Sequence, residues 1–405
     1  MRKYLLLLNL VALLPFSQAN AQTRYEWVPG SRQARAVPAT NSANAAQYAG
    51  QPQMQRPFAP HAMQPRWLIQ QQYAQQQQMQ SQAPQSQAAV PSRQNTVTKT
   101  AMPPSKKYIH FTDTVAVDGM QRQFQVHVPP AYDRLKPMPV VLIFHGLHMN
   151  GTMMVGATGF NAIADRNNFI AVYGEAVNGR WNDGHTGTGV DDVAYVSALL
   201  DKLATVVSVD RRRVYACGIS NGGFFSQVLA CTLTNKIAAA GVVASTMMSQ
   251  TETLMQSSKT MPIVFFLGTD DSLLPWADGR TKDIGKLGEV LGLSGIGSID
   301  NGLAQTYGGL LTVPQTINFW TSHNRCSSTT SATQVPDRDP KDGTRVKKEV
   351  YGSSGSEVVL YTIEGGGHSW PGCPNLKAIS SIGGNISQDI DASALMWDFF
   401  KTHSR

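Results

Sequence analysis

The chain has 405 residues, of which 42% are hydrophobic and 15% charged, and its formal net charge is +7. The basic excess lies near the N-terminus, where residues 22–107 hold nine Lys or Arg residues and a single acid, Glu26. Without these and without Arg2 and Lys3, 23 basic and 26 acidic residues remain, a net charge of −3. This larger part of the chain therefore lacks the basic surface of a nucleic-acid-binding protein.

Residues 1–21 have the three parts of a signal peptide. Two basic residues are followed by an apolar run over residues 4–16 and a small-residue exit, Ala19-Asn20-Ala21. The apolar run is shorter than the roughly 20 residues that span a bilayer, and no later stretch is long enough. We expect cleavage after Ala21 and export to the periplasm or the medium, without stable membrane insertion.

Residues 22–105 are rich in Gln, Ala, Pro and Ser and have no sustained apolar period. Such a composition cannot build a core, so we expect a disordered Gln-rich arm. Its basic residues suggest either contact with an anionic envelope surface or a solvated spacer, and the spacer is the interpretation we favour. The remaining residues, 106–405, have the length of a single large α/β domain with a substantial core.

This domain is expected to open with an antiparallel hairpin. Strand-like runs over residues 108–117 and 122–128 are separated by Asp118-Gly119, a strong two-residue hairpin signal. A continuous apolar run over residues 139–144 follows and ends at His145-Gly146. Such a run is typical of a central parallel strand that is covered on both faces.

The pattern then alternates between helices and strands, which implies crossover connections and a parallel sheet. The chain order is a helix over 159–166, a strand over 169–173, a helix over 192–207, a strand over 213–217, a helix over 221–232 and strands over 238–244 and 263–267. Residues 273–313 show no clear pattern and are interpreted as a lid or insertion. A strand over 358–363, a glycine run and a helix over about 391–403 close the domain.

The central chemical signal is Gly218-Ile219-Ser220-Asn221-Gly222, which follows an apolar strand and precedes a helix. A serine hydroxyl is a poor nucleophile at neutral pH, so it must be held on a tight turn where a base can reach it. The glycines at positions 218, 222 and 223 relieve crowding between the strand and the helix. We therefore predict that Ser220 is a catalytic nucleophile.

His368 is the best candidate for the base, because it follows a late strand and the glycine run at residues 365–367. Other histidines are interpreted as structural, among them His145, His403, His110 and His127. For His145, a place in the oxyanion loop is the alternative. No clustered His and Cys spacing of a zinc site is present, and the chemistry needs neither a metal nor an organic cofactor.

The orienting acid should lie between nucleophile and base in the chain, in the order found in α/β hydrolases. Gly268-Thr269-Asp270-Asp271 follows a predicted strand and offers two carboxylates. We favour Asp271, with Asp270 as the alternative, and interpret Asp191 as the N-cap of the following helix. The oxyanion donors are expected to be the backbone N–H groups of Asn221 and Leu147.

Four cysteines are candidates for disulfides in a chain expected to be exported. Cys217 should end a buried strand and Cys231 lies about three helical turns further on, so we expect these two to be buried free thiols. Cys326 and Cys373 both fall in loops of the C-terminal part. A bridge between them is left open.

Together these residues resemble the secreted esterases grouped with poly(3-hydroxybutyrate) depolymerases and the related feruloyl and acetylxylan esterases. The resemblance spans nearly all of residues 106–405 and rests on His145-Gly146, Arg180-Trp181-Asn182-Asp183-Gly184, Asp191-Asp192-Val193, the segments 214–223 and 364–372, and Gly268-Thr269-Asp270-Asp271. It implies an α/β-hydrolase fold with Ser220, His368 and Asp271 as nucleophile, base and acid. It also implies that Trp181 and Trp370 lie near the mouth of the site and receive an acyl chain or sugar ring, with packing as the alternative.

The chain departs from this family in two places. The oxyanion loop, residues 146–151, reads Gly-Leu-His-Met-Asn-Gly instead of the usual Gly- and Cys-rich version, which implies a bulkier pocket beside the acyl group. Relatives often carry a cysteine near residues 351–355 that is absent here, so the partner of Cys326 stays open.

The expected function is serine ester hydrolysis through an acyl-enzyme. The favoured substrate is a poly(3-hydroxybutyrate)-type polyester or its oligomers, and the alternative is a feruloyl or acetyl ester of plant polysaccharide. A non-catalytic surface-binding protein with a hydrolase fold is a third interpretation, against which the complete Ser, Asp and His set argues.

Overall fold

The computed structural model of the protein describes residues 24–27, 34–37, 109–183, 189–255, 259–274, 276, 310–326, 329–373 and 383–405. The expected signal peptide, most of the expected arm and nearly all of the expected lid lie outside these ranges. Within them, no helix combines the length and the apolar character needed to cross a bilayer.

Residues 1–61 fall into one compact unit and residues 62–405 into another. In the first unit, β1 (Arg24–Trp27) and β2 (Ala34–Val37) pair antiparallel. These two short segments of the expected arm are paired strands, and the rest of the expected arm lies outside the described residues. Tyr25, Trp27 and Val37 favour extended backbone, a local signal that the Gln-rich composition of the longer segment conceals.

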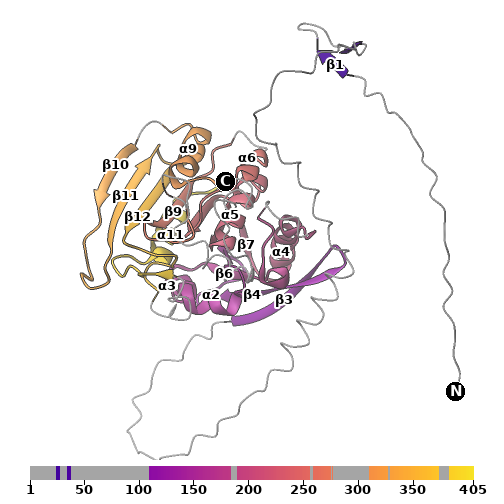
Figure 1. Ribbon diagram of the computed structural model, residues 1–405. Coiled ribbons are helices and arrows are strands. Elements are labelled where there is room, and N and C mark those ends of the chain that lie inside the picture. Colours follow the sequence, from indigo (N-terminus) through magenta and orange to yellow (C-terminus); the bar gives the residue numbers. More distant parts are fainter. Residues whose placement is uncertain are drawn as a thin grey trace, which may run out of the picture. The chain divides into compact units, whose positions relative to one another are not determined.

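The main domain is built on a ten-stranded sheet with the order β10-β11-β12-β9-β8-β7-β5-β6-β4-β3 (Figure 1). The six central strands, β12 and β5 to β9, pair parallel, and the two strands at each edge are antiparallel. The bounds are β3 (Ile109–Val117), β4 (Met120–Val128), β5 (Met138–Phe144), β6 (Ile170–Gly174), β7 (Val209–Ile219), β8 (Ala239–Val243), β9 (Ile263–Gly268), β10 (Thr329–Gln334), β11 (Arg345–Tyr351) and β12 (Val358–Glu364).

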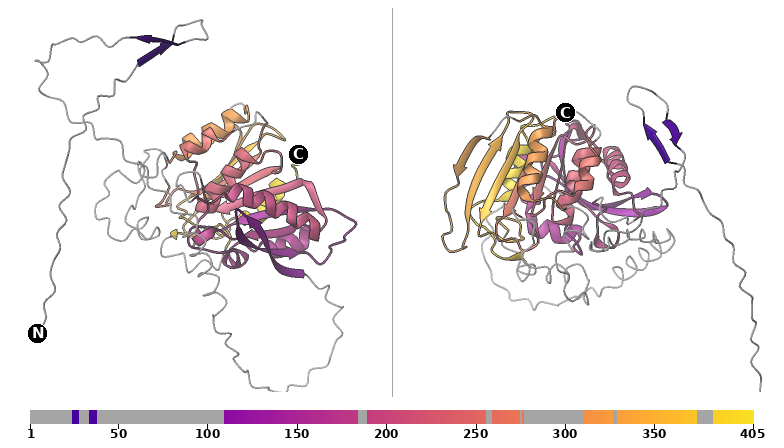
Figure 2. Two further views of the ribbon diagram at one scale, coloured as in Figure 1. Left: turned by 90° about the vertical axis from the view of Figure 1, so that its right-hand side faces the viewer. Right: turned by 45° about the horizontal axis from the view of Figure 1, so that its top comes forward.

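Helices cover both faces of this sheet (Figure 2). One face, which carries Leu142 and Phe144 of β5, packs against α4 (Asp192–Val206), α5 (Asn221–Thr232) and α9 (Val313–His323). The other, which carries Val141 and Ile143, packs against α2 (Gly151–Thr158), α3 (Phe160–Asn167) and α11 (Ala392–Phe400). Every residue of β5 is buried, because both faces of this central strand are covered.

This mostly parallel sheet flanked by helices is the α/β-hydrolase architecture expected from the sequence. The predicted hairpin is confirmed, since Asp118 and Gly119 join β3 to β4 with φ values of 50° and 78°, as a type I′ turn requires. The sequence analysis did not predict α2, which follows the oxyanion loop directly, α6 (Ser249–Thr253), α9, or the antiparallel strands β10 and β11. The sequence of β11, RVKKEVY, lacks the apolar alternation that identifies a strand locally.

Candidate active site

Ser220 lies at the turn from β7 into α5, with φ of 55° and ψ of −123°. Positive φ strains a residue that has a side chain, by about 1–3 kcal/mol where the fold enforces it. The fold enforces it here because Gly218 and Gly222 pack so closely, with the carbonyl of Phe144 against both, that a Cβ at either glycine would overlap backbone atoms. The N–H of Ser220 is fixed by the carbonyl of Val243 at 3.0 Å. The half-buried serine therefore stands on the strained turn that the motif predicts.

His368 and Asp271 are hydrogen-bonded to each other although they lie 97 residues apart in the chain. Nδ1 of His368 is 2.8 Å from Oδ2 of Asp271, whose side chain is fully buried. The other carboxylate oxygen accepts the N–H of Leu273 at 2.8 Å. Asp270, the alternative acid, is exposed. With Nδ1–H donated to Asp271, Nε2 of His368 is the nitrogen that can accept a proton.

Ser220, Asp271 and His368 come to one edge of the sheet. They follow the carboxyl ends of β7, β9 and β12, which run parallel and are joined through β8. The N–H of Asp270 donates to the carbonyl of Gly366 at 2.8 Å, which ties the loop after β9 to the loop after β12. In open α/β sheets this is the edge at which ligands bind.

The two expected oxyanion donors are the backbone N–H groups of Asn221 and Leu147. Asn221 is the first residue of α5, and the N-cap Ser220 makes no side-chain hydrogen bond to the helix, so the first amides keep the donor capacity of a helix N-terminus. Gly146 lies against Ser220, since a Cβ built on it would stand 3.6 Å from the Cβ of Ser220. Leu147 follows directly and is half-buried. The structure thus places the loop that carries Leu147 beside Ser220.

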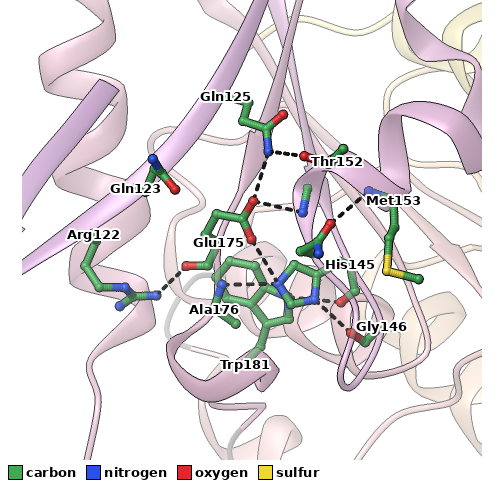
Figure 3. A network of polar contacts seen from close by, with 12 residues as sticks. Arg122, Gln123, Gln125, His145, Gly146, Thr152, Met153, Glu175, Ala176 and Trp181 are labelled. Atoms are coloured by element: carbon green, nitrogen blue, oxygen red, sulfur yellow. Dashed lines mark hydrogen bonds and ion pairs between the residues drawn. The ribbon is translucent and has the colours of Figure 1, made fainter. Parts of the chain in front are cut away.

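His145 is a buried structural residue at the start of the oxyanion loop. Its Nε2 accepts the N–H of Ala176 at 3.1 Å, and its Nδ1 lies 2.7 Å from the carbonyl of Gly146, which makes Nδ1 the donor (Figure 3). Burial lowers the pKa of His145 to about 4, so the ring is neutral at pH 7. This agrees with a structural role for His145.

Trp181 and Trp370 are both core residues, which favours packing, the alternative to the expected place at the mouth of the site. Trp181 is 0% exposed, stacks on Phe225 with ring centroids 5.0 Å apart, and donates from Nε1 to the carbonyl of His145 at 3.0 Å. Trp370 is 1% exposed and donates from Nε1 to Oγ of Ser393 at 3.0 Å. With each indole N–H satisfied, the large apolar rings are stable in the core, and neither presents a face to a ligand.

A buried ion pair braces the segment next to the nucleophile turn. Nη2 of Arg122 lies 2.6 Å from Oδ1 of Asp192, with both side chains at most 1% exposed. Oδ2 of Asp192 accepts the N–H of Asn182 at 2.7 Å. The neighbouring Trp181 donates its backbone N–H to the side chain of Asn221 at 2.7 Å. The ion pair therefore connects β4 and α4 to the first residue of α5.

We expect Asp192→Ala to lower the free energy of unfolding by about 3–5 kcal/mol, because it leaves the Arg122 guanidinium unpaired in the interior. Urea unfolding followed by circular dichroism measures this change. Asp201→Ala, at an exposed position of the same helix, is the matched control and should change the value by less than about 1 kcal/mol. A loss for Asp192→Ala no larger than that of the control would contradict the bracing role.

Two residues near the site were not singled out from the sequence. Glu175 follows β6 directly and accepts the N–H of Gly151, the first residue of α2, at 3.0 Å. Trp276 is half-buried and donates from Nε1 to the carbonyl of Gly268 at 2.8 Å, at the end of the strand that leads to Asp271. An acid directly after an apolar strand was a signal for Glu175, whereas nothing in the local sequence marked Trp276.

Two of the four cysteines, Cys217 and Cys231, were expected to be buried free thiols, and the structure confirms this. Cys217 and Cys231 are buried and free, and burial raises the pKa of Cys231 to about 12, which makes its thiol unreactive. Cys326 donates from Sγ to the carbonyl of Ser356 at 3.3 Å, whereas Cys373 is buried with its Sγ against α2. The structure contains no bridge between these last two residues.

Residues 123–265, which run from β4 into β9 and include Ser220, match the model of the family described as Esterase PHB depolymerase. Over 271 residues the chain is 26% identical to a protein of Nocardia uniformis subsp. tsuyamanensis that is named as an esterase, NocK; the match covers 64% of this chain and 73% of that protein. It is 24% identical to feruloyl esterase B of Piromyces equi over 61% of this chain, but spans only 42% of that relative. A solved structure, acetyl xylan esterase from Aspergillus awamori, matches with a TM-score of 0.44 and 13% identity, over 67% of this chain and 98% of that one.

Proposed function

We propose that this carboxylic ester hydrolase, whose residues 123–265 match the model of the family described as Esterase PHB depolymerase, acts through Ser220, His368 and Asp271. The observation that carries the proposal is the 2.8 Å hydrogen bond between His368 and Asp271, at the same sheet edge as the strained Ser220. A nucleophile, a base and an orienting acid at one edge of the sheet are the parts that acyl transfer requires.

In the first step, Oγ of Ser220 attacks the ester carbonyl carbon while Nε2 of His368 takes the hydroxyl proton. Asp271 holds the Nδ1–H tautomer and stabilises the imidazolium that forms. The carbonyl oxygen becomes an oxyanion, to which the N–H groups of Asn221 and Leu147 donate. His368 returns the proton to the leaving alcohol, and the acyl group stays on Ser220. Water, activated by the same imidazole, then attacks the acyl-enzyme and releases the acid.

For the substrate we propose a poly(3-hydroxybutyrate)-type polyester or its soluble oligomers. The family description supports this choice. The loop next to the serine supports it as well, because Leu147 and Met149 are half-buried and Sδ of Met149 lies 3.1 Å from where a Cβ on Gly146 would stand. Apolar side chains that crowd this loop suit a short hydroxyacyl unit.

The second candidate is a feruloyl or acetylxylan esterase. Relatives named feruloyl esterase and acetylxylan esterase support it, and so does Trp276, whose half-buried ring lies close in the chain to Asp271. An aromatic face at this place would suit a hydroxycinnamoyl group.

We also propose that the chain is exported by way of residues 1–21, as their basic, apolar and small-residue parts indicate. The enzyme would then meet its ester outside the cytoplasm. The Gln-rich arm, residues 22–105, would serve as a spacer or, through its basic side chains, contact an anionic envelope surface.

A substrate panel tests the proposed function. We expect kcat/KM for 3-hydroxybutyrate oligomers to exceed that for methyl ferulate by about tenfold or more, with measurable turnover of p-nitrophenyl butyrate and of amorphous polymer. The rate of the Ser220→Ala variant is subtracted in each case. A preference for methyl ferulate would favour the second candidate. The absence of any Ser220-dependent turnover would overturn the enzymatic proposal in favour of a surface-binding protein.

A further inference from the structure

The oxyanion loop is held by one short segment of the chain, residues 175–179. This segment follows β6 directly and contains a 3-10 turn, η1 (Val177–Gly179). Three hydrogen bonds join them, one at each end of the loop and one in its middle: Ala176 N–H to His145 Nε2 at 3.1 Å, Gly151 N–H to Glu175 Oε1 at 3.0 Å, and His148 N–H to Gly179 O at 2.9 Å. Leu147, the expected oxyanion donor, lies between these anchors. Its position relative to Ser220 therefore depends on this segment.

Glu175 provides the only charged anchor among these three bonds. Its Oε1 accepts from Gly151 and also from Nε2 of Gln125 at 3.1 Å, and its Oε2 lies 3.9 Å from Nε2 of His145 (Figure 3). The side chain is 17% exposed, and burial raises its pKa, while the two hydrogen bonds to Oε1 oppose this shift. The carboxylate thus faces the first amide of α2 and the imidazole that begins the loop.

The backbone on either side of this carboxylate is itself fixed. The N–H of Glu175 donates to the hydroxyl of Tyr195 at 3.3 Å, and its carbonyl accepts from Nη2 of Arg122 at 3.0 Å. Arg122 is held in turn by the buried Asp192. The carboxylate lies close to the loop backbone, because a Cβ on Gly151 would stand 2.8 Å from Oε1 and would displace it. Loop and carboxylate are therefore fitted to each other at contact distance.

We propose that Glu175 is a positioning residue for ester hydrolysis, which holds the N–H of Leu147 at the place where the oxyanion develops. This inference rests on the proposed acyl-transfer function. Glu175 acts through the loop and does not touch the substrate. Its contribution is therefore made in the transition state, where the oxyanion exists, and hardly at all in the ground-state complex.

The test compares Glu175→Ala with Glu175→Gln. We expect Glu175→Ala to lower kcat for p-nitrophenyl butyrate by about 10- to 100-fold with KM within about twofold, because a displaced loop misplaces a donor used only in the transition state. The inhibition constant of a trifluoromethyl ketone, which forms an oxyanion on the serine, should rise by a similar factor. Glu175→Gln keeps an oxygen that accepts from Gly151 and should restore most of the activity.

Glu349→Ala, on β11 and paired with Lys347, is the matched control and should leave both constants unchanged. The proposal is overturned if Glu175→Ala loses no more kcat than this control, if KM changes and kcat does not, or if Glu175→Gln is as impaired as Glu175→Ala. Any of these results in an active wild-type enzyme would leave the proposed function standing. A wild-type protein without Ser220-dependent turnover would overturn both.

Discussion

Replacing Ser220 with alanine is expected to lower kcat for ester hydrolysis by about 10⁴- to 10⁶-fold, because the variant has no oxygen on which an acyl-enzyme can form. The remaining rate would come from substrate binding and the oxyanion donors alone. Initial rates with p-nitrophenyl butyrate measure the loss, and labelling of the intact protein by a fluorophosphonate, followed by mass spectrometry, measures the nucleophile directly.

Ser322→Ala is the control for this change, because it removes an exposed hydroxyl on α9 and should keep wild-type rates and labelling. The Ser220→Ala protein should keep its cooperative thermal transition, since alanine adds no atom to the turn. Fluorophosphonate labelling that persists in Ser220→Ala would place the nucleophile elsewhere and contradict the assignment.

The second large effect is expected from Asp271→Asn, with a loss in kcat of about 10⁴-fold. The carboxylate accepts Nδ1–H of His368 at 2.8 Å and the N–H of Leu273 at 2.8 Å. An amide in its place can turn its NH₂ toward the ring, which favours the tautomer that has its proton on Nε2. That tautomer cannot accept the proton of Ser220.

Asp270→Asn is the natural control, because it changes the adjacent aspartate, which is exposed, without altering its backbone bond to Gly366. It should keep kcat within about threefold of the wild type. The two variants, assayed with the same ester, separate the alternatives that the sequence leaves open. A greater loss of kcat for Asp270→Asn than for Asp271→Asn would assign the orienting role to Asp270 and contradict the proposal.

Features that depend on short stretches of chain were predictable from the sequence. The type I′ turn at Asp118-Gly119 follows from two residues that tolerate positive φ. The nucleophile turn follows from the glycines that flank Ser220, and α5 has the predicted bounds, Asn221–Thr232. The parallel sheet follows from alternating apolar segments, each of which is buried as expected. In each case the cause lies within a few residues of the effect.

The tertiary structure decided what depends on residues far apart in the chain. Trp181 and Trp370 lie next to the site motifs in sequence, yet both rings are buried in the core. Trp181 stacks on Phe225, and Trp370 donates a hydrogen bond to Ser393. The choice of Asp271 over Asp270 depends on which carboxylate meets an imidazole 97 residues away.

The contact of Glu175 with the oxyanion loop also depends on the tertiary structure, since Glu175 and Gly151 are 24 residues apart in the chain. The sequence by itself predicted the proposed nucleophile and base and determined the scaffold, because local steric and apolar patterns indicate them. Which polar groups support that nucleophile was decided only by folding, because hydrogen bonds and ion pairs form between whichever groups the sheet brings within about 3 Å of each other.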